Sequence, residues 1–138
     1  MSQLDRTLTP LLGRLMLAAI FIWSGLGKAM APDMVMGYIQ HAGLPSPQLA
    51  YVVSLVIELG GGLALAAGLL TRWVGAVLAV WCLVTGVIFH LQPADYEQMI
   101  NFYKNLGMAG GLLFVAANGP GLWSLDAAFG RRRVAATA

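Results

Sequence analysis

The chain has 138 residues, of which 59% are hydrophobic and only 10% carry a charge. A soluble domain of this size normally has about a quarter of its residues charged, because its surface must be solvated. The composition therefore excludes a soluble monomer and a disordered chain, and it indicates one all-α domain solvated by lipid. The single cysteine excludes an internal disulfide, and with two histidines it predicts no metal, iron–sulfur or two-histidine haem site in one chain.

Four apolar stretches are each long enough to cross a bilayer as a helix. They cover residues 11–30, 49–70, 73–91 and 102–118. Pro10 and Pro32 are placed to bound the first stretch, and the tight turn Thr71-Arg72 makes the second and third antiparallel neighbours. The loop before the second stretch can hold a short interfacial helix over Met34–Ile39. The sequence thus predicts an integral membrane four-helix bundle, with residues 1–138 forming a single transmembrane domain.

The basic residues are distributed unequally between the two ends of this bundle. Six lie at the termini or in the turn between the second and third helices, whereas only Lys28 and Lys104 lie at the other end. The positive-inside rule then places both termini in the cytoplasm and predicts a multi-pass protein of the cell inner membrane. The Arg131–Arg133 cluster lacks interleaved aromatic residues, which favours an anionic lipid surface over nucleic acid as its partner. A cleaved secretory signal over residues 1–31 is the less favoured alternative, because Lys28 interrupts the apolar run.

Glu58 is the carboxylate whose predicted position is most unfavourable. It lies roughly 15 Å below the outer boundary of the second helix, where an ionised side chain costs about 2.5 to 3.5 kcal/mol. Its side chain cannot reach the interface, whereas Lys28 and Lys104, near the outer ends of the first and fourth helices, can extend inward. We therefore expect an ion pair between Glu58 and a lysine.

Polar residues occupy one face of each predicted helix, in its outer half. Because polar groups turned toward lipid would stay unsatisfied, these faces are expected to meet around one pocket. The residues in this arrangement are Lys28, Tyr51, Glu58, His90, Lys104 and Asn105. The alternative is that they only hold the bundle together, as an internal clasp and as hydrogen bonds between helices. His90 is also compatible with an interfacial side chain, and Cys82 with a small core residue.

The two halves of the chain show a weak internal similarity. Ser24-Gly25 and Thr85-Gly86 occupy similar depths in the first and third helices, and Glu58-Leu59-Gly60 resembles Asn105-Leu106-Gly107. A repeat would make Glu58 and Asn105 equivalent positions that flank one site, although a fourth helix starting at residue 102 leaves Asn105 shallower. The glycine-rich faces are typical of close helix contacts and are compatible with a homo-oligomer.

Motifs between Arg14 and Asp126 carry a likeness to a known family. They are Arg14-Leu15, Phe21 with Ser24-Gly25 and Lys28, Glu58-Leu59-Gly60-Gly61-Gly62-Leu63, Gly68-Leu69 with Thr71-Arg72, Phe89-His90, Lys104-Asn105-Leu106, and Gly119-Pro120-Gly121 with Ser124-Leu125-Asp126. On these motifs the chain resembles the DoxX family of small four-helix membrane proteins. That family is named after a subunit of a thiosulfate:quinone oxidoreductase, so the resemblance implies a quinone-handling redox protein and leaves its substrate open.

Two kinds of function are compatible with the sequence. The first is an oxidoreductase subunit that binds a quinone-like molecule, with Glu58 and His90 exchanging protons. The side chains that would bind that molecule are Lys28, Tyr51, Lys104 and Asn105. No motif for a flavin, haem or metal is recognisable, so electrons would come from a partner subunit or a soluble donor. The second is a non-enzymatic membrane scaffold or assembly factor whose polar cluster is structural; transport is a weaker third option, because four helices make a thin bundle.

Overall fold

All regular structure in the described part of the chain is helical, as the sequence predicts. The computed structural model describes residues 3–136, and it describes the side chains of residues 7–130. In chain order the elements are α1 (Gln3–Met30), α2 (Pro32–His41), α3 (Pro47–Leu55), the π-helical turn η1 (Val56–Gly60), α4 (Gly61–Ala67), α5 (Thr71–Thr85), the π-helical turn η2 (Gly86–His90), α6 (Tyr96–Asn118) and α7 (Leu125–Ala136). The predicted orientation depends in part on Arg6 and Arg131–Arg133, and the side chains of these residues lie outside the described range.

Within the described residues, three helical segments are long and apolar enough to cross a membrane: Thr7–Met30, Pro47–Ala67 and Thr71–His90. The second combines α3, η1 and α4, and the third combines α5 and η2. The stretch predicted as the remaining span lies in α6, a helix of 23 residues that is not among these three segments. It is less apolar than the other three because Asn101, Lys104 and Asn105 lie within it.

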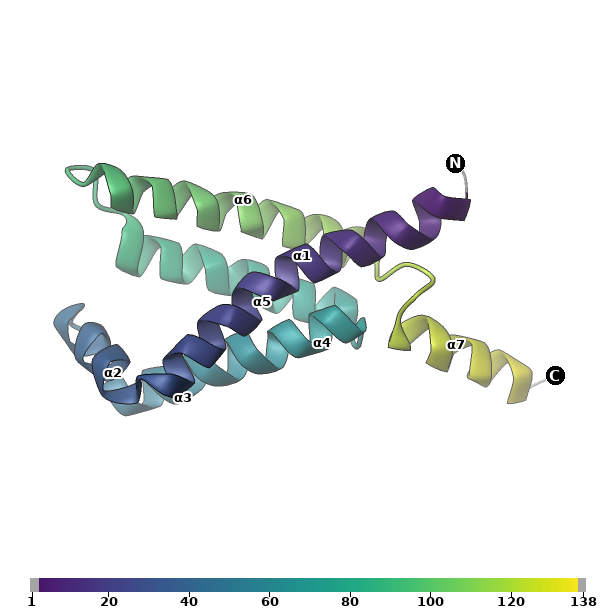
Figure 1. Ribbon diagram of the computed structural model, residues 1–138, viewed down its shortest axis with the longest axis horizontal. Coiled ribbons are helices and arrows are strands. Elements are labelled where there is room, and N and C mark those ends of the chain that lie inside the picture. Colours follow the sequence, from purple (N-terminus) through teal and green to yellow (C-terminus); the bar gives the residue numbers. More distant parts are fainter. Residues whose placement is uncertain (1–2, 137–138) are drawn as a thin grey trace.

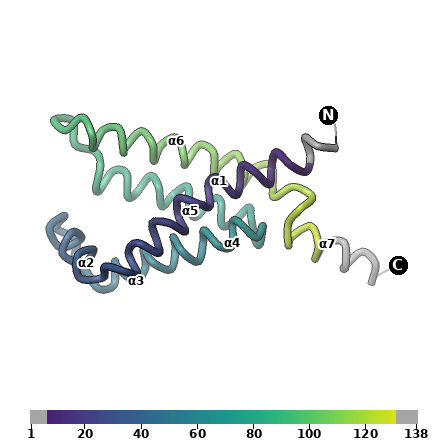
Figure 2. The backbone as a smooth tube through the Cα atoms, viewed as in Figure 1, coloured from purple at the N-terminus to yellow at the C-terminus, as the bar shows by residue number. Residues whose placement is uncertain are grey.

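The long helices pack side by side around a small apolar core. α6 runs along α5 and η2, while α1 crosses η1 and α4 (Figure 1). Figure 2 shows the same path as a tube, with α2 at one end of the molecule and α7 at the other. We refer to these as the α2 end and the α7 end. The buried core residues are Ala18, Phe21, Leu65, Leu78, Ala79, Cys82, Ala109 and Leu112, which confirms the prediction for Cys82.

Two helix starts differ from the predicted ones. α6 begins at Tyr96 and not at residue 102, because the Asp95 carboxylate accepts a hydrogen bond from the Gln98 amide at 3.1 Å and caps the helix. α1 begins at Gln3 and not at residue 11, so Pro10 lies inside the helix, where its ring removes one backbone hydrogen bond. A short helix in this loop is confirmed, since α2 includes Met34–Ile39, and its interfacial location stays a prediction.

Two arginines bind helix ends at the α7 end. Arg14 is fully buried, and its guanidinium donates to the carbonyls of Leu65 at 3.1 Å and Ala66 at 3.2 Å, the last turn of α4. It also donates to the Trp123 carbonyl at 2.6 Å, in the segment before α7. Arg72 donates to two carbonyls in the last turn of α6. Each arginine thus satisfies carbonyl groups that a helix end leaves without a partner.

Asp126 binds the start of α5. Its two carboxylate oxygens accept hydrogen bonds from the Leu70 and Thr71 amides, both at 2.8 Å. Burial alone would raise the pKa of Asp126, but these hydrogen bonds and the nearby Arg14 charge outweigh it, so the pKa lies below its ordinary value. The first turn of α7 is therefore tied to the turn between α4 and α5.

Candidate functional site

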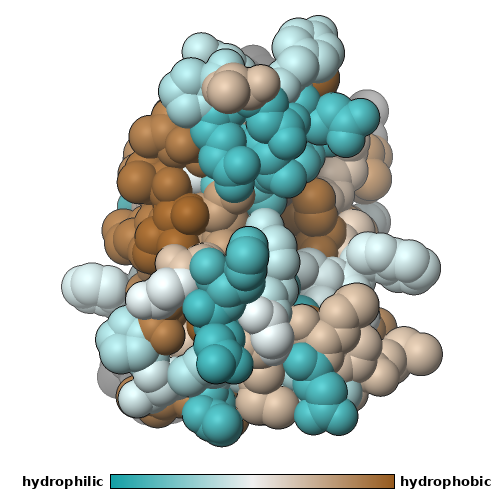
Figure 3. All heavy atoms as spheres, turned by 90° about the vertical axis from the view of Figure 1, so that its left-hand side faces the viewer, coloured by the Kyte–Doolittle hydropathy of each residue, from teal (hydrophilic) through white to brown (hydrophobic). Residues whose placement is uncertain are grey.

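A cavity of about 660 Å³ lies between the helices toward the α2 end. Its walls are mainly apolar side chains from α1, α2, α3, α5, η2 and α6. Figure 3 views the molecule from this end. Hydrophilic side chains gather at the top and bottom of the view, and apolar side chains lie at its sides. The volume lies within the range of about 300–1,000 Å³ that is common for small-molecule sites. The position of this cavity fits that of the predicted polar pocket.

Glu58 and Lys28 form an ion pair in the wall of this cavity. The Lys28 ammonium lies 2.5 Å from Glu58 Oε2, and the side chains are 24% and 8% exposed. The expected pairing of Glu58 with a lysine is therefore confirmed, and the lysine is Lys28. A second hydrogen bond from Lys28 to Ser24 Oγ, 2.7 Å long, fixes the ammonium between α1 and η1.

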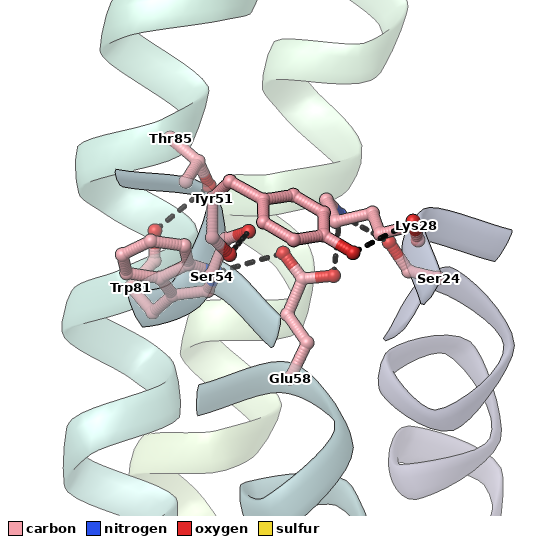
Figure 4. A network of polar contacts seen from close by, with 7 residues as sticks. All are labelled: Ser24, Lys28, Tyr51, Ser54, Glu58, Trp81 and Thr85. Atoms are coloured by element: carbon pink, nitrogen blue, oxygen red, sulfur yellow. Dashed lines mark hydrogen bonds and ion pairs between the residues drawn. The ribbon is translucent and has the colours of Figure 1, made fainter. Parts of the chain in front are cut away.

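Trp81 completes the environment of the carboxylate, and it is a residue that the sequence argument missed. Its indole N–H donates to Glu58 Oε1 at 3.1 Å, so each oxygen of Glu58 has one partner (Figure 4). The position of Trp81 along its helix could have predicted this hydrogen bond. An indole N–H in the middle of an apolar helix needs an acceptor, and Glu58 lies at a similar depth in the preceding span.

Tyr51 lies beside the ion pair and does not line the cavity. Its hydroxyl donates to the Lys28 backbone carbonyl at 3.3 Å, near the end of α1 (Figure 4). The hydroxyls of Ser54 and Thr85 each donate to a carbonyl of their own helix. Tyr51 therefore joins α3 to α1, and its predicted role in binding a ligand stays a prediction.

The opposite side of the cavity is formed by η2 and α6. His90 Nδ1 lies 2.7 Å from Gln98 Oε1. Because an amide oxygen only accepts hydrogen bonds, Nδ1 is the donor in this arrangement and carries the ring N–H. Lys104 donates to Asn101 Oδ1 at 3.3 Å, and Asn105 donates to the Asn101 carbonyl at 3.0 Å. All three predicted residues line the same cavity as Lys28 and Glu58. They bind neighbours on α6, however, and not the ion pair itself.

Both π-helical turns lie at this cavity. η1 contains Glu58 and η2 ends at His90, the two residues predicted to exchange protons. Turns of this type are rare in helices and occur frequently at functional sites. They widen the helix locally by one residue, which changes the direction of the side chains that follow. The two candidate acid–base residues are thus in the least regular parts of their helices.

Glu58 lies about 17 Å from Pro47 along its helix, and Asn105 lies about 14 Å from Tyr96 along α6. Two glycines also make related contacts. A Cβ on Gly25 would lie 2.9 Å from Leu59 Cβ, and one on Gly86 would lie 3.2 Å from Asn105 Cβ. The two contacts are offset by one residue, because the predicted repeat aligns Leu59 with Leu106 and not with Asn105, and the repeat stays a prediction.

Comparisons with known proteins agree with this arrangement. The DoxX family model matches residues 9–91. The chain is 35% identical over 116 residues to Inner membrane protein YqjF of Escherichia coli, an alignment that covers 84% of this chain and 88% of the relative. It is 35% identical over 121 residues to Inner membrane protein YphA of the same organism, with 84% of this chain and 86% of the relative covered.

A third relative comes from another organism. The chain is 31% identical over 134 residues to membrane protein Rv3486 of Mycobacterium tuberculosis, covering 88% of this chain and 82% of the relative. No solved structure matches the chain. Since the family match covers more than half of the chain and the relatives align over most of their length, the chain belongs to the DoxX family of inner membrane proteins.

Proposed function

We propose that this chain is a quinone-binding subunit of a membrane oxidoreductase. The observation that carries the proposal is a buried ion pair, Lys28–Glu58, that faces an apolar cavity with further polar groups on its opposite wall. Burying a charged pair in a lipid-embedded protein is costly, so such a pair marks a functional site by default. An apolar cavity with a few convergent polar groups fits a ring with two carbonyl oxygens and an apolar chain.

The polar groups of the cavity can supply the hydrogen bonds and the protons that quinone reduction needs. Reduction of a quinone takes up two electrons and two protons, so its carbonyls need hydrogen-bond donors and a source of protons. Lys28 keeps one N–H group after its two hydrogen bonds, and Lys104 and Asn105 line the other wall. Glu58 and His90 exchange the protons. The two electrons come from a redox partner, either a second subunit or a soluble donor.

The topology that suits this function has four spans. In it α6 is the fourth span, because it is 23 residues long and packs along α5 and η2. Both termini then lie in the cytoplasm, and the cavity opens in the outer half of the bilayer, away from most of the basic residues. The exposed glycines Gly107 and Gly110 leave room for close helix contact in a homo-oligomer.

Purification in mild detergent, followed by mass spectrometry of the bound lipids, quinones and proteins, tests this proposal. We expect a quinone and a redox protein to co-purify, and added quinone to bind with saturation. Glu58→Gln alone is ambiguous, because it leaves Lys28 unpaired. Lys28→Gln/Glu58→Gln, which removes both charges, is therefore the decisive variant. It should fold and lose quinone turnover; full turnover in a folded double variant would refute the role of Glu58.

A structural role for the cluster is the second candidate. It is favoured by one observation, that both carboxylate oxygens of Glu58 already have partners within the chain. In that case the protein is a non-enzymatic scaffold or assembly factor, and the ion pair is an internal clasp. Glu58→Gln would then lower the yield of folded protein, and the double variant would restore both yield and partner binding.

A further inference from the structure

The two lysines at the cavity differ in how their charge is balanced. The Lys28 ammonium is paired with the Glu58 carboxylate at 2.5 Å. The Lys104 ammonium makes one long hydrogen bond of 3.3 Å, to Asn101 Oδ1, and no carboxylate among the described side chains forms an ion pair with it. Among the lysine and carboxylate groups of the wall, one positive charge is therefore unbalanced.

The two lysines and Asn101 also leave hydrogen-bond donors free at the cavity. An ammonium has three N–H groups, so Lys104 keeps two of them and Lys28 keeps one after the bonds that they make. The Asn101 oxygen faces Lys104, which leaves the N–H groups of that amide for another acceptor. A head group that satisfies this wall must accept hydrogen bonds, and one that carries a negative charge also balances Lys104.

The remainder of the wall is suited to a hydrocarbon chain. Several of its apolar side chains are also exposed, so the apolar part of the cavity is accessible from the surface of the helical bundle. These side chains are Ile20, Leu49, Val53, Val84 and Ile88. A ligand can therefore place its chain along these residues and its head group near Lys104.

We propose that the cavity selects amphiphiles whose head group is an oxygen anion, such as a phosphate ester, carboxylate or phenolate, with Lys104 as its counter-ion. This inference rests on the cavity of the proposed function and adds the charge of the ligand. The anion has two sources, a free amphiphile or an anionic phospholipid of the bilayer. Lys104 supplies the selectivity in both cases, whereas Lys28 contributes little because Glu58 already neutralises it.

The test is native mass spectrometry of the intact protein in a neutral detergent, with two probes of equal chain length. Hexadecyl phosphate carries a charge and hexadecanol does not. We expect the wild type to bind the phosphate about fivefold more tightly, the upper range for an exposed ion pair. Lys104→Gln should remove this preference and Lys104→Arg should keep it. Lys104→Arg keeps the positive charge at this position and is therefore the matched control.

Further arms of the experiment separate the outcomes. Phosphatidylglycerol retained in preference to phosphatidylcholine, with the same dependence on Lys104, would identify the bilayer as the source of the anion. Equal binding of both hexadecyl probes, or a preference unchanged in folded Lys104→Gln, would overturn the inference. A short-chain ubiquinone serves as the neutral reference. If it binds while no anion preference exists, only this inference fails; if the preference holds and ubiquinone does not bind, only the proposed function fails.

Discussion

The contribution of the Lys28–Glu58 pair to stability can be measured with a double-mutant cycle. The Glu58 side chain is 8% exposed and the Lys28 side chain 24%, so each charge depends largely on the other for solvation. Removing one member of a buried pair costs about 3–5 kcal/mol, because the other charge stays buried without a partner. Lys28→Gln should reach about 3 kcal/mol, since it leaves the carboxylate with Trp81 as its remaining partner.

Glu58→Gln should cost less, about 2 kcal/mol, because the amide oxygen of Gln can still accept the Trp81 hydrogen bond and the lysine is partly exposed. The double variant leaves no buried charge at this position. It should therefore be more stable than the sum of the two single effects predicts, by about 1–3 kcal/mol. The free energies can be measured by unfolding in mixed micelles, with the loss of helix followed by circular dichroism.

A second cycle with Lys104 provides the control. Lys104 hydrogen-bonds to Asn101 and not to Glu58, so Lys104→Gln and Glu58→Gln should be additive within about 0.5 kcal/mol. Additivity in the Lys28 cycle would refute the buried ion pair as the centre of the site. Coupling in the Lys104 cycle but not in the Lys28 cycle would show that the other lysine forms the pair.

Three further predictions concern packing and the α7 end. Gly25→Ala would place a Cβ 2.9 Å from that of Leu59 and should destabilise the protein by about 1–3 kcal/mol in the same unfolding assay, whereas Gly27→Ala in the same helix, with nothing within 4 Å, should not destabilise it. Arg14→Met leaves buried carbonyls unpaired and should cost about 3 kcal/mol or more. Because the folded-state pKa of Asp126 is lowered, its stabilisation should be complete above about pH 4 and be lost as the pH falls further, and Asp126→Asn should remove this pH dependence.

The sequence predicts the helices well because their signal is spread over about 20 residues each. It predicts their ends less well, because a single side chain decides where a helix begins. Asp95 adds six residues to the start of α6 by accepting one hydrogen bond, and hydropathy alone assigns those polar residues to a loop. Gly68, in a left-handed conformation with φ of 70°, likewise ends α4 before the predicted boundary.

The candidate site was predictable in part for a similar reason. The energetic cost of a buried carboxylate requires a cation near Glu58, whatever the packing of the helices. Which lysine supplies it depends on the rotation of α1 and α6 about their axes, and the sequence leaves that rotation open. The Gly25 contact with Leu59 brings α1 close to η1 and so places Lys28 within reach. Trp81 was missed because its aromatic ring also fits an apolar helix without any polar partner.

The division between arginine and lysine in this chain follows from the number of hydrogen bonds that each can donate. An arginine has five N–H groups in a fixed plane, which suits the several carbonyls at a helix end. Arg14 and Arg72 each use their guanidinium in this way at the α7 end. Lys28 and Lys104 have compact ammonium groups and keep N–H groups free at the cavity. The arginine end is therefore suited to holding the helices together, and the capacity to bind a ligand lies at the lysine end.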